Sequence, residues 1–430
     1  MKRFRLSSYI LTGLLAVAAS ACSSDEPKVE DLGLSYKIKP VAAKTDIAVG
    51  AKLANMYSDM NGNSSRWETL IGECDFSKGK YGMNVKPALG IYRLVSKDPA
   101  LIDEVASNMG QIAAWGKKAG IDYFFTPPLK ERDHFYPDNI NEDDKAFLDL
   151  ISGRNRDAST WHNDGSTKYA MYVNIQDISR QLNTQQNTNP IENAADKTYT
   201  VDGEKITISA VERLMYYMRS LADYFKDDTY YKYDGRPVLM FRQAEEFHAL
   251  DIASIYARIR STIKDECGMD PYIICEFKGW RPAARFAYVV LDGGPDAITY
   301  REMCDVDEGG YYERFYMLGV SINENFKLNN DYLNRAYPDI EFIPPVSVGF
   351  NRSIYTPSEY KKPVINPDEA GLRERSWIAK MHLPSTPMVV LDSFNDWAWG
   401  SAIEPTEDGY GNSWGESMLD VVREEFKVNR

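Results

Sequence analysis

The chain has 430 residues, of which 43% are hydrophobic and 26% are charged, a composition typical of a globular protein with a sizeable core. Its formal net charge at pH 7 is -13. Neither nucleic acid nor an anionic membrane surface attracts so acidic a protein, so we expect neither as a partner.

The first 21 residues have the three parts of a secretory signal peptide. Lys2, Arg3 and Arg5 form the basic part, residues 9–18 the apolar part, and residues 19–21 (Ala-Ser-Ala) the small residues before a cleavage site. The apolar part is too short to span a bilayer as a mature helix. We therefore interpret residues 1–21 as an export signal.

The small residues before Cys22 resemble the lipobox of bacterial lipoproteins, which implies cleavage before Cys22 and attachment of lipid to its thiol. Residues 23–26 (Ser-Ser-Asp-Glu) are similar to the acidic surface-export signal of Bacteroidetes lipoproteins. The resemblance implies a surface-exposed outer membrane lipoprotein of a Gram-negative bacterium. The alternative is an ordinary secretory signal next to a chance cysteine. After the export signal, we interpret residues 22–45 as a flexible tether and residues 46–430 as the folded domain.

Four further cysteines are spread along the chain, at Cys74, Cys267, Cys275 and Cys304. Their spacing matches no zinc-binding pattern. An even number in an exported protein permits disulfides, but several of the cysteines stand in apolar contexts that suit buried free thiols equally well. Both alternatives stay open.

Amphipathic helices recur along the folded domain. The clearest begins at Asp98 and Pro99 and ends at Gly120, residues typical of a helix start and stop. Another begins with a capping box formed by Ser209 and Glu212. The predicted helices are residues 98–120, 143–151, 209–225, 252–267, 310–326, 368–380 and 415–426.

Short apolar segments separate these helices and predict strands. Residues 176–205 are a polar insertion with a small hairpin about Asp202-Gly203, and residues 286–291 are an additional strand or edge segment. The main predicted strands are residues 46–56, 121–125, 168–175, the segment from the Asp234-Gly235 turn to Arg242, and residues 272–277, 296–300, 342–349 and 388–394.

Eight strands that alternate with helices predict a (β/α)8 TIM-type barrel, here a single domain with loop insertions. A doubly wound open sheet is the alternative. It usually has fewer strands, and no glycine-rich phosphate loop follows the first strand of this chain.

Catalytic residues of such a barrel lie at the C-terminal ends of its strands. Polar side chains recur there, and the eighth strand in addition runs into two indoles, Trp397 and Trp399, which offer flat apolar surface to sugar rings. The candidate polar residues are Asn174, Arg242, Glu245, Glu276, Tyr300, Asn351, Arg352, Asp392, Asn395, Asp396 and Glu404.

Other chemistries lack their motifs. His134, His162, His248 and His382 show neither an HExxH pattern nor paired metal-ligand spacing. There is no Gly-x-Ser-x-Gly elbow, no Walker loop and no dinucleotide fingerprint. We therefore expect neither a cofactor nor a metal. Acids with aromatics favour glycoside hydrolysis, in which the carboxyl groups lie about 5 Å apart for retention and about 6.5–9.5 Å apart for inversion.

An ordered set of motifs resembles glycoside hydrolase family 99-like (WbsX-like) domains from about residue 47 to residue 426. The last of them, residues 394–405, is similar to the family's Asn-Glu-Trp-x-Glu-Gly … Glu-Pro motif. The others are residues 90–92 (Gly-Ile-Tyr), 98–99 (Asp-Pro), 119–124 (Ala-Gly-Ile-Asp-Tyr-Phe), Tyr231 with 234–238 (Asp-Gly-Arg-Pro-Val), 296–300 (Asp-Ala-Ile-Thr-Tyr) and 344–349 (Pro-Pro-Val-Ser-Val-Gly).

The resemblance implies a (β/α)8 barrel that acts on α-linked glycans. It also implies two glutamates, of which the first falls on Asp396 and the second, the acid/base at the leaving group, falls on Trp399. An indole cannot transfer that proton. Another carboxylate would have to supply it, and Glu276 and Glu404 are the candidates.

Two hypotheses follow. In the first, the chain is a glycosidase with Asp396 as base or stabilising carboxylate and Glu276 or Glu404 as acid. In the second, it is a non-catalytic glycan-binding protein that has lost the second carboxylate. In either case we expect the remaining polar and aromatic candidates to bind substrate, namely Asn174, Arg242, Tyr300, Asn351, Asn395, Trp397 and Trp399. Protein partners are not predicted.

Overall fold

The structure is a computed structural model. It describes residues 36–54, 72, 74–75, 78, 80–175, 178, 190–277, 290–301, 318–350, 365 and 367–428. The chain divides into two compact units, Met1–Ile38 and Lys39–Arg430, and the fold below is that of the second. The predicted signal peptide, Cys22 and most of the predicted tether lie outside the described residues. Within these residues, no helix has both the length and the apolar character needed to cross a membrane.

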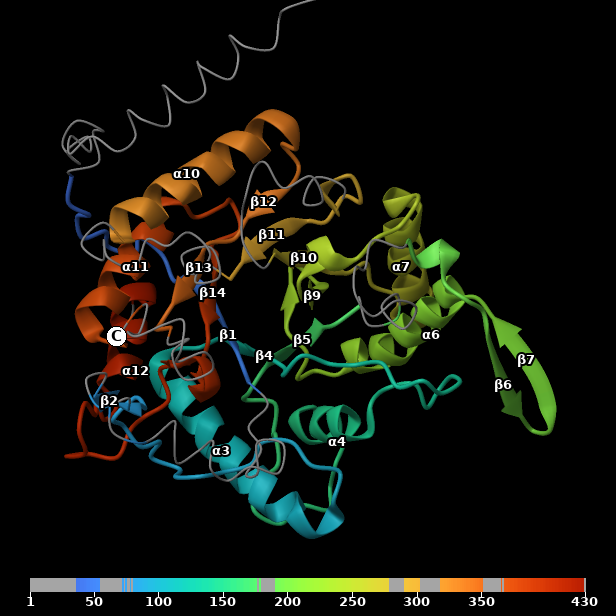
Figure 1. Ribbon diagram of the computed structural model, residues 1–430, viewed down its shortest axis with the longest axis horizontal. Coiled ribbons are helices and arrows are strands. Elements are labelled where there is room, and N and C mark those ends of the chain that lie inside the picture. Colours follow the sequence, from blue (N-terminus) through green and yellow to red (C-terminus); the bar gives the residue numbers. More distant parts are fainter. Residues whose placement is uncertain are drawn as a thin grey trace, which may run out of the picture. The chain divides into compact units, whose positions relative to one another are not determined.

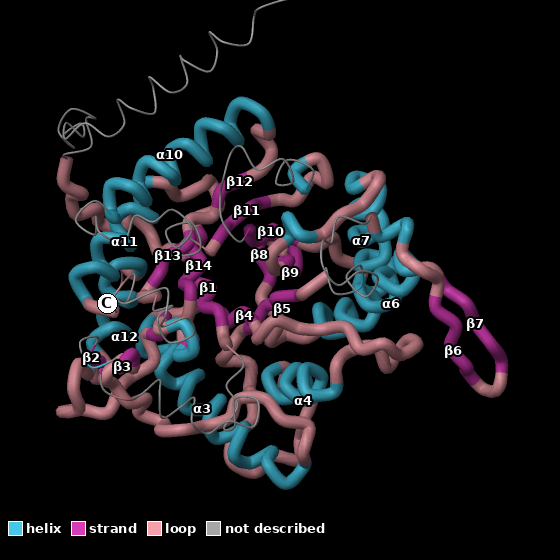
Figure 2. The backbone as a smooth tube through the Cα atoms, viewed as in Figure 1, coloured by secondary structure: helices cyan, strands magenta, loops and turns pink. Residues whose placement is uncertain are grey.

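A closed ring of parallel strands forms the centre of the second unit (Figures 1 and 2). The strands are β1 (Ala48–Lys52), β4 (Tyr123–Phe125), β5 (Tyr169–Val173), β9 (Arg236–Phe241), β10 (Tyr272–Phe277), β11 (Ala297–Tyr300), β12 (Glu341–Phe342), β13 (Pro345–Ser347) and β14 (Met388–Asp392). Their order around the ring follows their order in the chain.

Three strand pairings close this ring. β12 and β13 are consecutive parts of one extended segment, and β12 pairs with β11 while β13 pairs with β14. β14 in turn pairs with β1, so that Ala48 lies opposite Met388. With β12 and β13 taken as one strand, the described chain forms the predicted eight-stranded (β/α)8 barrel.

Helices surround the ring (Figure 1). Their predicted starts are confirmed where side-chain caps were expected: the Asp98 carboxylate accepts from Ala100 N, and Ser209 with Glu212 forms the capping box. Gly120 ends α3 in the left-handed conformation. The helices are α3 (Ile102–Ala119), α4 (Glu142–Ile151), α6 (Ala210–Ala222), α7 (Ile252–Cys267), α10 (Leu318–Ala336), α11 (Glu369–Met381) and α12 (Ser417–Phe426).

Two predictions between β10 and β12 were wrong. The described part of α10 continues to Ala336, ten residues beyond the predicted end at Phe326, because its buried face continues through a polar residue, the fully buried Asn329, to Leu333. Val290 and Leu291 are helical rather than extended, and the rest of the strand predicted at 286–291 lies outside the described residues.

The remaining described strands are short. β6 (Lys197–Val201) and β7 (Glu204–Ile208) form the predicted hairpin, which projects from the barrel in Figure 1. The others are β2 (Cys74–Asp75), β3 (Lys80–Tyr81), β8 (Lys232–Tyr233), β15 (Asn395–Asp396) and β16 (Ser401–Ala402). The sequence left open whether the cysteines form disulfides or are free thiols. Cys267 and Cys275 are free thiols.

Alternate residues of the strands fill the barrel interior, as the two-residue period of a strand requires. On β10, Tyr272 and Ile274 face inward, and on β14, Met388 and Val390 do so. A Cβ on Gly50 would lie 2.5 Å from the Tyr123 ring, so only glycine leaves room there. The next inward positions toward the C-terminal ends are charged: Lys52, Glu276 and Asp392.

Candidate active site

A cavity of about 310 Å³ lies at the C-terminal ends of the barrel strands, where catalytic sites of this fold are found. Residues from β1, β5 and β14 line it together with the segments that follow β4, β9, β11 and β14. They are Lys52, Leu53, Ala54, Pro128, Lys130, Tyr172, Asn174, Arg242, Arg301, Asp392, Ser393, Asp396 and Trp399.

Lys52 connects the carboxylates beneath the cavity. Its Nζ lies 2.5 Å from Glu276 Oε1 and 2.7 Å from Asp392 Oδ1. The Tyr172 hydroxyl donates to the other oxygen of Glu276. All four residues are buried, and each comes from a different strand. A buried charge needs such pairing because it has lost its water.

Arg301 joins the two aspartates that line the cavity. Its Nε lies 3.9 Å from Asp392 Oδ2, and one of its terminal nitrogens lies 3.9 Å from Asp396 Oδ2. The backbone of Arg301 is fixed by the sheet, since its N–H donates to Phe277 O at 2.9 Å. The two carboxylate oxygens are therefore at most about 10 Å apart, which is compatible with the separations of about 5 to 9.5 Å in glycosidases.

Local structure sets the position of Asp396. The chain leaves β14 through Ser393, where the Asp392–Ser393 peptide bond is cis, and the Ser393 hydroxyl accepts from Asp396 N at 2.8 Å. Asp396 then caps a short 3-10 turn, residues 397–399, by accepting from Trp399 N at 3.3 Å. Gly400 ends the turn with a φ of 64°.

The two aspartates have pKa values shifted in opposite directions. Burial alone would raise the pKa of Asp392, but the charges of Lys52 and Arg301 outweigh it and hold this pKa below its ordinary value. Burial raises the pKa of Asp396 to about 6, opposed by Arg301 and reinforced by the Asp392 carboxylate. At a pH somewhat below 6, Asp396 is mostly protonated while Asp392 is ionised, because the pKa of Asp392 lies below the ordinary value for aspartate.

Glu276 and Glu404, the two predicted acids, do not line this cavity. Glu276 is fully buried beneath it between Lys52 and Tyr172. Glu404 is fully buried elsewhere, and its Oε2 accepts from Tyr92 Oη and Trp397 Nε1, both at 2.7 Å. Burial raises the pKa of Glu404 to about 8, so it is protonated at pH 7.

The predicted substrate-binding residues divide into two groups. Asn174, Arg242 and Trp399 line the cavity. Trp399 is partly exposed and stacks on Phe350, with ring centroids 5.6 Å apart.

The others are not brought to the cavity. Asn395 is buried and donates to Tyr92 Oη at 2.9 Å, and Trp397 is buried against Trp414. Tyr300 is buried beside Phe326 and Phe342, so all three side chains pack inside the fold and do not line the cavity. Asn351 and Arg352 lie outside the described residues.

Three residues that the sequence analysis did not select complete the site. Lys52 and Tyr172 are inward-facing residues of predicted strands, so strand parity could have indicated both. Arg301 directly follows the sixth strand and belongs to the strand-end positions by the same rule that selected Tyr300. Asp392 was among the candidate residues but had no assigned role.

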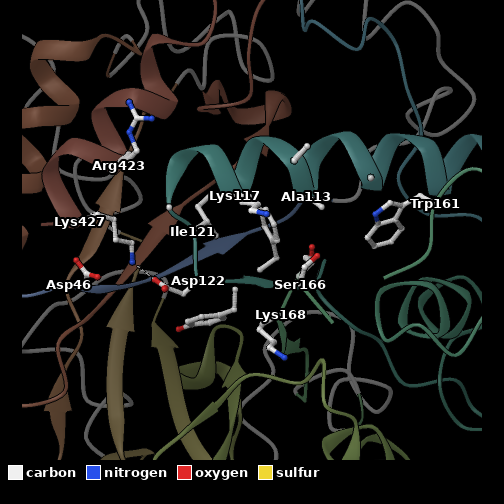
Figure 3. A pocket seen from close by; sticks show the side chains of 16 residues that line it. Asp46, Ala113, Lys117, Ile121, Asp122, Trp161, Ser166, Lys168, Arg423 and Lys427 are labelled. Carbon is white, nitrogen blue, oxygen red and sulfur yellow. Dashed lines mark hydrogen bonds and ion pairs between the residues drawn. The ribbon is translucent and has the colours of Figure 1, made fainter. Parts of the chain in front are cut away.

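A larger cavity of about 560 Å³ lies at the opposite end of the barrel (Figure 3). Trp161 and Lys117 line one side, and Asp122 and Lys427 the other. Asp122 pairs with Lys427 at 2.6 Å, and Asp46 accepts from the backbone of Val428. Its two carboxylates are thus engaged, and active sites of this fold lie at the other end of the barrel.

Solved structures of similar fold belong to glycoside hydrolases. A structure described as a glycoside hydrolase-like protein matches with a TM-score of 0.67 and 22% identity, over 93% of this chain and 99% of that one. The GH99 endo-alpha-mannosidase from Bacteroides thetaiotaomicron matches with TM-scores of 0.53 (in complex with bis-tris-propane) and 0.50, at 14% and 13% identity, over 89% of this chain and 99% of that one.

The chain has the fold of a family 99-like glycoside hydrolase. No protein-family model matches the sequence, and no curated protein does. The predicted barrel and its resemblance to family 99-like domains are confirmed at the level of the fold. The fold alone does not define an activity, because one fold carries many functions.

Proposed function

We propose that the chain is a glycoside hydrolase whose proton donor is Asp396 and whose ionised carboxylate is Asp392. One observation supports the proposal above others: the two acids line the same cavity, are joined through Arg301, and have pKa values shifted apart. Two carboxyl groups with divergent pKa values in one site are the arrangement that glycosidic cleavage needs.

Each acid has a distinct task in this proposal. Protonated Asp396 gives its proton to the oxygen of the leaving sugar as the glycosidic bond breaks. Ionised Asp392 faces the positive charge that develops on the sugar ring, either as nucleophile or as the base that activates water. Trp399 provides an apolar surface for a sugar ring at the mouth of the cavity.

In this proposal Asp396 has the role of acid that was predicted for Glu276 or Glu404, and Asp392 has the role of ionised carboxylate that was predicted for Asp396. Glu276 already shares both of its oxygens with Lys52 and Tyr172. Glu404 accepts hydrogen bonds from Tyr92 and Trp397, and none of these three residues lines the cavity. We assign these two glutamates to the support of the site rather than to proton transfer.

A glycan-binding protein without activity is the second candidate. Trp399 stands where the family's second glutamate falls, and it lines the cavity. Asp392 is engaged by Lys52 at 2.7 Å, which weakens it as a base. In this alternative the cavity holds a glycan that is never cut.

The experiment compares wild type with Asp396→Asn and Asp392→Asn on a panel of polysaccharides, measuring both binding and release of reducing ends. Asp202→Asn in the hairpin turn, which is exposed and has a φ of 52° that asparagine tolerates, is the matched control. A hydrolase requires that both cavity variants bind but do not cut. A glycan that wild type binds tightly and never cuts establishes the second candidate.

We further propose that the chain is a surface lipoprotein of the outer membrane, on the strength of the residues around Cys22. Labelling of cells with radioactive palmitate tests this, with Cys22→Ala as the comparison. Incorporation into wild type but not into the variant is the expected result, and equal incorporation contradicts the proposal.

A further inference from the structure

The cavity carries more positive charge than its two aspartates balance. Its described lining contains four basic residues, Lys52, Lys130, Arg242 and Arg301. This is contrary to the chain as a whole, whose formal net charge is -13. A local excess of cations on an acidic protein indicates a ligand of negative charge.

Two of these cations are already paired. Lys52 lies between Glu276 and Asp392, and Arg301 lies between Asp392 and Asp396. They serve the catalytic carboxylates.

Arg242 differs from them. It is partly buried, and no carboxylate among the described residues forms an ion pair with its guanidinium. Its backbone is nevertheless fixed, because Arg242 N donates to Val173 O at 2.9 Å and so extends the β5–β9 ladder. A guanidinium at a cavity wall that no described carboxylate pairs with is prepared for an anion, since part of its desolvation has already taken place in the folded chain.

The ring order places Arg242 far from the acids. It follows β9, and between β9 and β14 lie β5, β4 and β1 on one side of the barrel. Arg242 therefore stands across the cavity mouth from Asp392 and Asp396, yet lines the same cavity. A sugar between them would meet the acids at its glycosidic bond and Arg242 at a ring substituent.

We propose that the substrate is an anionic glycan, with a carboxylate or sulfate group bound by Arg242. This rests on the proposed function and specifies its substrate class. Both groups present paired oxygens that a guanidinium binds through two parallel hydrogen bonds. Lys130, which is exposed, adds a second positive charge, and the amide of Asn174, directly after the neighbouring strand β5, lies on the same side for sugar hydroxyls.

The test uses matched polymer pairs that differ only in charge. Polygalacturonate is compared with its carboxyl-reduced form, and chondroitin sulfate with its desulfated form, so that the two anion types are distinguished. Dissociation constants are measured at an ionic strength of about 0.15 M, where distant charges are screened. The proteins are wild type, Arg242→Gln, Arg242→Lys and, as control, Lys205→Gln on the exposed hairpin.

We expect wild type and Lys205→Gln to bind one charged polymer about tenfold or more tighter than its neutral form, as a charge-assisted hydrogen bond implies. Arg242→Gln should remove this preference, and Arg242→Lys should retain part of it. Equal binding within both pairs, or a preference that survives Arg242→Gln, overturns the inference. If wild type then cleaves a neutral polymer and Asp396→Asn does not, the proposed hydrolase still holds and only the anionic substrate is excluded. If wild type cleaves no polymer at all, the result contradicts the proposed hydrolase itself.

Discussion

The ammonium of Lys52 lies 2.5 Å from Glu276, a residue on the opposite part of the barrel, and both side chains are buried. Lys52 also pairs with Asp392, so one cation compensates two carboxylates. The mutual attraction keeps the pKa of Lys52 above its ordinary value although burial alone would lower it. The buried carboxylates of β10 and β14 thus share a cation that comes from the first strand.

The first prediction concerns the stability that Lys52 provides. Lys52→Met leaves two buried carboxylates without their cation, which should lower the free energy of unfolding by about 3–5 kcal/mol. Urea denaturation measures the loss. Lys118→Met is the control, because its pair with Glu416 is exposed and worth about 0–1 kcal/mol. If the two substitutions lower the free energy of unfolding by the same amount, the buried ion pairs of Lys52 stabilise the fold no more than an exposed pair does.

The second prediction is the pH dependence of hydrolysis. Asp396 must be protonated to act as acid, and its pKa is about 6. The rate should therefore fall as the pH rises through about 6, and should fall again at low pH where Asp392 gains a proton. A profile of kcat/KM against pH measures both limbs. A rate that stays constant from pH 5 to pH 8 would exclude Asp396 as the proton donor.

The third prediction concerns Glu404, whose pKa is raised to about 8 in the folded chain. Between about pH 4.5 and pH 8 the unfolded chain releases this proton and the folded chain keeps it, so stability falls as the pH rises through this window. Glu404→Gln has no such proton and can keep the bonds from Tyr92 and Trp397.

Urea denaturation at several pH values checks this. The stability of Glu404→Gln relative to wild type should rise with pH between about 4.5 and 8, by up to about 1.4 kcal/mol per pH unit. A difference that does not change with pH would mean that Glu404 is ionised in the folded chain.

The fourth prediction concerns the aromatic surface of Trp399. Trp399→Ala should weaken binding of the substrate glycan about tenfold, because stacking of a sugar on an indole is lost. Affinity electrophoresis in gels that contain the glycan measures this. Trp161→Ala, which removes an indole from the cavity at the opposite end of the barrel, should bind as wild type does. Similar losses in both variants would place the binding surface elsewhere.

Most of the fold could be predicted from the sequence because its signals are local. The apolar segment at residues 272–277 and the amphipathic segment at residues 252–267 predicted the bounds of β10 and α7 as observed. Caps and strand periodicity depend on neighbours within a few residues. Where a polar residue is buried on the inner face of a helix, as Asn329 is in α10, the local signal was misleading.

The site was predictable only in part. The rule that strand ends carry catalytic residues led to Asp396, Arg242 and Asn174, which do line the cavity. Whether a buried acid faces the cavity or a packing partner depends on residues far away in the chain. Glu404 accepts a hydrogen bond from Tyr92, which lies more than 300 positions earlier in the chain, and no local sequence pattern predicts that bond.

The pairing of β1 with β14 has a consequence for biosynthesis. Val49 lies opposite Val389, so the first strand of the barrel finds this neighbour only when nearly the entire chain has been made. Contacts of such sequence separation form slowly. A ribosome-bound or truncated chain that ends before Met388 therefore has an open sheet edge at β1 and lacks both aspartates of the cavity. Nascent and clipped forms of this protein should accordingly be inactive and depend on chaperones to keep that edge from aggregating.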